Sequence, residues 1–212
     1  MGKLFNFIIS ITIAASTFVN INKFYNLDIY NTIMDESCIV IESGVQGKYL
    51  SQSSIEEEIK KIETLFKIEG KIKKYNNNFY FNSKGDTTEL NIFAIEEKRG
   101  INVEITIKEV GKNNNIDVLE NCLKKANKNI KISSYLKGKV NNNFGVNKNV
   151  QILEDKLLNL NPNNIESINI DSGITGVVEF NNGEKINYAV VNYNDSKDVY
   201  MIIGTPVIFI TY

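Results

Sequence analysis

The sequence predicts an α+β protein built on an antiparallel sheet, and three observations support this expectation. Segments such as Ile101–Val110 alternate apolar and polar residues with a period of two, which is typical of strands with one buried face. Turns that contain Asn or Gly separate these segments. Other segments carry apolar residues at three- and four-residue spacings, which favours amphipathic helices. A composition of 42% hydrophobic and 23% charged residues suits a globular core.

The first 20 residues have the form of an export signal. Lys3 precedes an apolar stretch whose densest part is Phe7–Ala15, and small residues would permit cleavage after Ala15 or Ser16. The stretch is shorter than the ~20 apolar residues that span a bilayer comfortably. We expect residues 1–20 to be a signal peptide or, if uncleaved, an N-terminal anchor. The protein would then be extracytoplasmic, either secreted or attached to the membrane through this segment alone.

The chain from residue 21 onward is expected to form the α+β domain, and it begins with a helix. Apolar residues within 24–43 recur at helical spacings, and Gly44 follows as a C-terminal stop would. Val45–Leu50 is then a short strand. Ser54 and Glu57 form a capping-box pattern that predicts the start of a second helix.

Four strands and a helix follow, and the second half repeats this order. In the first half the expected strands are Ile68–Lys74, Phe79–Ser83, Thr87–Glu96 and Ile101–Val110, and the helix is Asp117–Lys128. In the second half a strand at Lys131–Val140 and a helix from about Lys148, ending before Pro162, precede the strands Ile165–Asp171, Ile174–Phe180, Lys185–Tyr193, Val199–Ile203 and Val207–Tyr212.

Two details refine the second half. Asn182-Gly183 is a hairpin turn signal, and Pro206, which lacks an N–H group, should lie at a bulge or a strand start. The shared element order suggests pseudo-repeats at about 45–128 and 131–212. Two copies would form one long curved sheet with helices on one face.

The composition argues against several kinds of chemistry. Histidine is absent, so the usual catalytic triads and Cys–His pairs are impossible, and two cysteines without histidine make no zinc site. We expect no catalytic, cofactor-binding or metal-binding residue. A net charge of −1 and a single arginine, Arg99, argue against nucleic acid as a partner. The aromatic residues Phe79, Phe81, Phe93 and Phe180 are interpreted as core residues.

The two cysteines, Cys38 and Cys122, both fall on the apolar faces of predicted helices. Buried positions of this kind suit free thiols. Export would also permit a disulfide between them.

Strands that are apolar on both sides indicate a surface that must be covered. Lys185–Tyr193 carries Ile186, Tyr188 and Val190 on one face and apolar residues on the other, and Val199–Ile203 is similar. If helices cover one face, the other needs the helix over 24–43, a partner protein, a lipid or a second copy. The residues of this possible partner or self-covering surface are Phe24, Leu27, Met34, Ile41, Ala189, Val191, Tyr193, Tyr200 and Ile202.

The order of these elements and the final residues carry a resemblance. The export signal, the helix up to Gly44, the strand through Gly47-Lys48, the two sheet blocks and above all the ending Gly204–Tyr212 resemble the YwmB-like family of exported proteins from spore-forming Firmicutes. That family is named for its similarity to the TATA-box-binding-protein fold. The resemblance implies this fold and an extracytoplasmic setting linked to the envelope or to sporulation, and it transfers no functional residues.

The expected function is that of a non-enzymatic binding or scaffold protein of the cell envelope, with an envelope protein or a second copy as partner. The alternative is a cell-wall glycan hydrolase that uses two carboxylates, drawn from acidic residues such as Glu96, Glu97, Glu104 and Asp171. Nucleic-acid binding through a TATA-box-binding-like sheet is disfavoured, because fold similarity alone does not transfer function.

Overall fold

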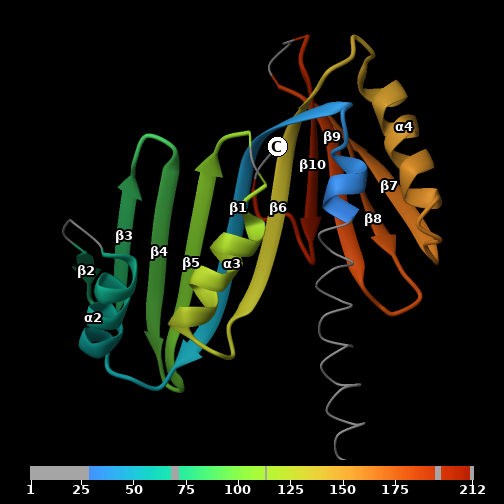
Figure 1. Cartoon of the computed structure of the whole chain (residues 1–212). Helices are drawn as coiled ribbons and strands as arrows, with labels where there is room; N and C mark the ends of the chain where they lie inside the picture. The colour runs from blue at the N-terminus through green and yellow to red at the C-terminus, as the bar shows by residue number, and fades with distance from the viewer. Residues whose placement is uncertain (1–28, 68–71, 113, 194–196, 211–212) are drawn as a thin grey trace, which may run out of the picture. The chain divides into compact units, whose positions relative to one another are not determined.

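The computed structural model describes residues 29–67, 72–112, 114–193 and 197–210 (Figure 1). The chain divides into two compact units, residues 1–35 and residues 36–212. In the first unit, the described residues form a short helix at 29–33. The second unit is an α+β domain with a large antiparallel sheet.

The described residues of the second unit form ten strands and three helices. They follow one another along the chain as β1 (Cys38–Ser51), α2 (Ile55–Phe66), β2 (Lys73–Tyr75), β3 (Asn78–Lys84), β4 (Thr88–Glu97), β5 (Gly100–Val110), α3 (Ile116–Ala126), β6 (Lys131–Val140), α4 (Val146–Leu158), β7 (Asn164–Ile170), β8 (Gly173–Glu179), β9 (Lys185–Asn192) and β10 (Val199–Thr205).

All ten strands belong to one open sheet in the order β2-β3-β4-β5-β1-β6-β10-β9-β8-β7. Every neighbouring pair is antiparallel. β1 and β6 pair at the centre, where β5 adds to the other edge of β1 and β10 adds to the other edge of β6 (Figure 1). The strands β1 to β5 are called the first half below, and β6 to β10 the second half.

The helix predicted over 24–43 is wrong from residue 34 onward. The helix ends at residue 33, and Cys38 and Ile41 belong to β1. Both edges of β1 are paired, with β5 and with β6, and its β-branched residues favour the extended backbone. Gly44 is therefore no helix stop. It lies within β1, where an added Cβ would collide with the ring of Tyr135.

Several local signals are confirmed, and others are corrected. Ser54 caps α2 through both hydrogen bonds of a capping box with Glu57, and Gly183 adopts a positive φ of 81° in the hairpin between β8 and β9. The strand predicted at Val207–Tyr212 is wrong over 207–210, which form no strand, and residues 211–212 lie outside the described part; Pro206 directly follows the end of β10. The strand expected at 68–74 is found at Lys73–Tyr75, and residues 68–71 lie outside the described part.

The strand register separates the side chains of the sheet into two faces. On one face, Tyr49 of β1 donates its hydroxyl hydrogen to Glu58 of α2 at 2.5 Å, and Tyr188 of β9 donates to Glu154 of α4 at 2.5 Å. α3 also packs against β1 and β6, on the side of the sheet where α2 lies (Figure 1). We call this the helix face and the other the opposite face.

Candidate functional site

The opposite face of the second half is covered by the chain's own C-terminal segment, residues 206–210. Tyr135, Ala189, Val191 and Ile202 form a fully buried cluster on this face. The partly buried side chains that pack against the cluster are Ile170, Tyr193, Tyr200, Ile208, Phe209 and Ile210. Phe209 meets the ring of Tyr135 edge-on, with 5.0 Å between the ring centroids.

Five of the residues predicted to form a partner or self-covering surface are thus brought together, namely Ala189, Val191, Tyr193, Tyr200 and Ile202. Met34 belongs to the other unit of the chain, and Ile41 lies at a bulge in β1. Phe24 and Leu27 lie outside the described residues. Among the described residues of 36–212, the segment 206–210 covers this apolar face. The sequence had suggested the helix over 24–43, a partner protein, a lipid or a second copy for this role.

Two tyrosines form the rim of the covered cluster. The rings of Tyr193 and Tyr200 meet edge-on at 5.3 Å. The ammonium group of Lys137 lies 4.4 Å from the centroid of Tyr193 and 5.2 Å from that of Tyr200. This cation–π arrangement closes one side of the cluster with polar groups.

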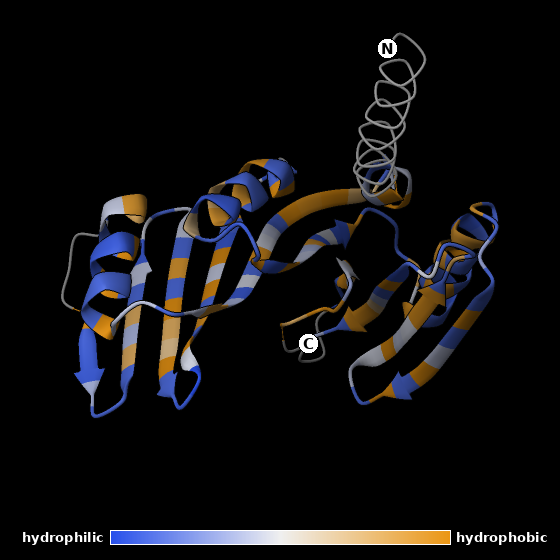
Figure 2. Cartoon of the chain, turned by 90° about the horizontal axis from the view of Figure 1, so that it is seen from below, coloured by the Kyte–Doolittle hydropathy of each residue, from blue (hydrophilic) through white to orange (hydrophobic). Residues whose placement is uncertain are grey.

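The opposite face of the first half has a different character. Its strands are banded blue and orange in Figure 2, because apolar residues alternate with polar ones. The inward residues of β3 to β5, such as Phe81, Ile92 and Ile105, are buried. On the opposite face, Tyr80 and Phe93 are cross-strand partners with 39% and 40% of their surface exposed. Two large aromatic side chains therefore remain accessible here.

Polar side chains form a row beside these aromatic residues. The amide of Asn82 donates to Asn91 Oδ1 at 2.5 Å, and Asn91 donates to Glu89 at 2.8 Å. On the far side of the row, Gln46 Nε2 lies 3.2 Å from Thr106 Oγ1. These side chains combine donors and acceptors on the surface of the sheet.

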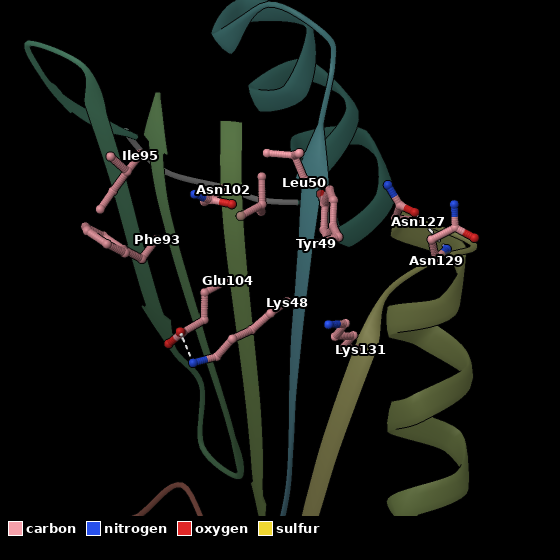
Figure 3. A pocket seen from close by; sticks show the side chains of 11 residues that line it. Lys48, Tyr49, Leu50, Phe93, Ile95, Asn102, Glu104, Asn127, Asn129 and Lys131 are labelled. Carbon is pink, nitrogen blue, oxygen red and sulfur yellow. Dashed lines mark hydrogen bonds and ion pairs between the residues drawn. The ribbon is translucent and has the colours of Figure 1, made fainter. Parts of the chain in front are cut away.

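A hollow of about 660 Å³ opens at one end of this face. Strands β1, β4, β5 and β6 and the turn after α3 supply its walls (Figure 3). The side chains of Leu50, Phe93 and Ile95 give it an apolar floor, and Leu50 is 45% exposed. Asn102, Asn127 and Asn129 add three amides.

The hollow contains two lysines and one carboxylate, and the carboxylate pairs with only one of the lysines. Lys48 and Lys131 are direct cross-strand partners of β1 and β6, and like charges so placed repel each other. Glu104 Oε2 lies 2.8 Å from the ammonium group of Lys48, and Glu104 Oε1 accepts a hydrogen bond from Gln46 at 3.0 Å. Both carboxylate oxygens are thus engaged, and among the described residues no carboxylate pairs with Lys131.

A second carboxylate, that of Glu58, is buried between α2 and the sheet. Glu58 is fully buried and accepts hydrogen bonds from Tyr49 and Ser51, both at 2.5 Å, and from Lys61 at 2.9 Å. Burial acts to raise the pKa of this carboxyl group. The hydrogen bonds from Ser51, Tyr49 and Lys61 outweigh that effect, and the pKa is lowered. A carboxylate held ionised in this way braces α2 against β1.

The carboxyl groups considered for hydrolysis are not assembled as an acid–base pair. Glu104 lies in the hollow beside Lys48, and Glu96 and Glu97 lie at the end of β4. Wherever the pKa of a carboxyl group is displaced in the described ranges, at Glu56, Glu58 and Glu89, the direction is downward. The same ranges contain no group of three Cys, Asp or Glu side chains that could hold a metal ion.

Sequence reasoning missed the hollow because it treated Phe93 as a core residue. Phe79, Phe81 and Phe180 are buried as predicted, but Phe93 lies on the opposite face. A usable signal was present, since Ile92 and Ala94 flank Phe93 and occupy the inward positions of β4. The proximity of Lys48 and Lys131 depends on pairing between β1 and β6, which no local pattern specifies.

Comparison of the chain with models of known protein families and with curated proteins gives no match. None of the helices among the described residues is both long and apolar enough to cross a bilayer.

Proposed function

We propose that this chain is a non-enzymatic binding protein of the extracytoplasmic cell envelope that holds a ligand on the opposite face of its first half. The observation that carries the proposal is the difference between the two halves. The chain covers the apolar surface of the second half with its own C-terminal segment, whereas Leu50, Tyr80 and Phe93 stay 39–45% exposed around a hollow in the first half. Exposed apolar groups gathered at one place favour an interaction site.

The setting and the finer description of the fold belong to the same proposal. Each half runs strand, helix and four strands, and its last strand returns to pair with its first. This order supports a tandem repeat and a curved sheet of the TATA-box-binding-protein type. The predicted export signal and the YwmB-like ending of the sequence support an envelope role, including one in sporulation.

The chemistry of the site favours a binding role over glycan hydrolysis and over nucleic-acid binding. A glycosidase needs one carboxyl group with a raised pKa, and the displaced carboxyl groups named above are all shifted downward. A nucleic-acid surface needs many cationic contacts along a phosphate chain. On this face Glu104 neutralises Lys48, and Glu89 lies within the fields of Lys84 and Lys108.

Sedimentation with isolated cell envelopes tests the proposal. We expect the whole 212-residue chain to sediment with envelopes from its source organism, and Phe93→Ser to reduce the bound fraction severalfold. Val118→Ser is a matched control, because Val118 is a 68% exposed apolar residue of α3. A chain that stays in the supernatant, or equal binding by both variants, would contradict the proposal.

A further inference from the structure

The size of the hollow indicates the kind of ligand it admits. A volume of about 660 Å³ falls within the ~300–1,000 Å³ typical of small-molecule sites. A stable protein partner would instead need about 800 Å² of buried surface on each side. The lining residues come from four strands and the turn after α3, so the hollow is wide enough across the sheet for more than one sugar ring (Figure 3).

The walls of the hollow combine two chemistries. Phe93, Ile95 and Leu50 offer an apolar surface on which a flat, aliphatic ring face can pack. Asn102, Asn127 and Asn129 carry amides, each of which both donates and accepts hydrogen bonds. Asn127 Oδ1 already accepts from the backbone N–H of Asn129 at 2.8 Å, which fixes this turn in place. Hydroxyl groups, which also donate and accept, are the natural partners of such amides.

The charge of the hollow adds a third requirement. Lys48 and Lys131 are cross-strand partners of β1 and β6. The side chain of Lys48 extends toward Glu104, which also accepts a hydrogen bond from Gln46 (Figure 3). One positive charge, on Lys131, is therefore left over at the edge of the hollow. A single carboxylate from a ligand would neutralise it.

We propose that this hollow binds a carboxylate-bearing sugar unit of a glycan chain, an inference that rests on the binding function proposed above. One ring of the glycan packs its apolar face on Phe93 and Ile95 of β4, and its hydroxyl groups bond to the asparagine amides. The carboxylate of the next sugar unit pairs with Lys131 of β6, because three strand spacings of about 4.8 Å each separate β4 from β6. A phosphate chain fits less well, because Glu104 lies at the centre of the site and a row of phosphates would need further unpaired cations.

Titration of the whole chain with two tetrasaccharides, followed by nuclear magnetic resonance, tests the inference. One alternates N-acetylglucosamine with N-acetylmuramic acid, and the other contains N-acetylglucosamine alone and lacks the carboxylate. We expect the acidic tetrasaccharide to bind more tightly and to shift the signals of Leu50, Asn102 and Asn129. Lys131→Gln should weaken the acidic ligand about tenfold, as expected for the loss of one charge-assisted hydrogen bond, and leave the neutral one unchanged.

Lys60→Gln is the matched control, because Lys60 is an exposed residue of α2, which lies on the helix face, whereas the hollow lies on the opposite face. Equal affinity for both tetrasaccharides, equal effects of Lys131→Gln and Lys60→Gln, or tighter binding of single-stranded DNA would each overturn the inference. If the chain still sediments with envelopes in a Phe93-dependent way while neither sugar binds, the ligand class is wrong and the binding function stands. If both measurements fail, both proposals fall.

Discussion

At the scale of single residues, the buried carboxylate of Glu58 shows how one charge can fix a helix to a sheet. Its oxygens accept hydrogen bonds from Tyr49 and Ser51 of β1 and from Lys61 of α2. The pKa of Glu58 is lower in the fold than in the unfolded chain. Its contribution to stability is therefore complete above the unfolded pKa of about 4.3 and is lost as the pH falls through the lower folded value.

Replacement of this carboxylate should destabilise the fold in a pH-dependent way. We expect Glu58→Gln to lower the free energy of unfolding at pH 7 by about 1–3 kcal/mol, because an amide cannot accept all three hydrogen bonds. The difference from the natural chain should shrink below about pH 4, where the carboxyl group also protonates. Denaturant unfolding at a series of pH values measures this, with Glu63→Gln on the same helix as control. A difference that is constant with pH would contradict the assignment.

The cysteines provide a second prediction at this scale. Cys38 and Cys122 do not form a disulfide with each other; Cys38 is buried in β1, and Cys122 is half-buried in α3. Burial raises the pKa of the Cys122 thiol, and Lys125 offsets part of this effect. We therefore expect both thiols to react slowly with a maleimide at neutral pH in the fold and rapidly after denaturation. A mass two hydrogens lower in the unreduced protein would show a disulfide instead.

Residue-level prediction from the sequence succeeded where the signal is local. The capping box of Ser54 and Glu57 and the turn at Gly183 depend on residues within a few positions, and both are found in the structure. The environment of Cys38 was mistaken, because the apolar spacing around it fits a helix and a strand almost equally well. The choice was made by strand partners that lie far away in the sequence.

At the scale of elements, residues 206–210 show that a segment without regular secondary structure can bury an apolar face of the sheet. Residues 206–210 form no strand, yet Ile208, Phe209 and Ile210 pack on the apolar cluster of the second half. A run of apolar residues after Pro206 favours a strand on propensity alone. Prediction from the sequence correctly required a cover for this surface, and the fold of the whole sheet decided which segment supplies it.

Shortening one side chain of this segment should loosen the cover. Phe209→Ala removes the edge-on contact with Tyr135. We expect a loss of about 2 kcal/mol in the free energy of unfolding, less than for a fully buried phenylalanine because Phe209 is only partly buried. Binding of a hydrophobic dye should rise as the cluster becomes accessible.

Val207→Ala serves as the matched control in the same segment, since Val207 is 56% exposed. It should change both measurements little. Equal effects of the two substitutions would mean that residues 206–210 do not protect the cluster.

At the scale of the whole molecule, the opposite face of the sheet is covered in one half and accessible in the other. The second half is closed by residues 206–210, whereas the first keeps a hollow lined by Phe93, Asn102 and Lys131. The α+β class and the antiparallel sheet were predictable, because period-two alternation and turn residues recur along the sequence. The placement of β1 beside β6, and with it the hollow, arises from pairing over long sequence separations.

The export signal predicted from the sequence can be tested in cells. Residues 1–30 fused to a reporter that is active only outside the cytoplasm should yield activity, because Lys3 and the stretch Phe7–Ala15 have the form of a signal peptide. Replacing Ile8 and Ile9 with Asp should abolish this activity. A reporter that remains inactive in the cytosol with the natural segment would remove the basis for an envelope role.

The central position of β1 also determines the order in which the strands of the sheet can pair. β1 is the first strand of the sheet to be synthesised. Its two partners, β5 and β6, are synthesised only after several other elements. Pairings between residues so far apart are slow to form, and until then the unpaired edges can attract other chains. If the chain is exported unfolded, β1 reaches the far side of the membrane before β5 and β6. Until they follow, its unpaired edges need protection from pairing with other chains.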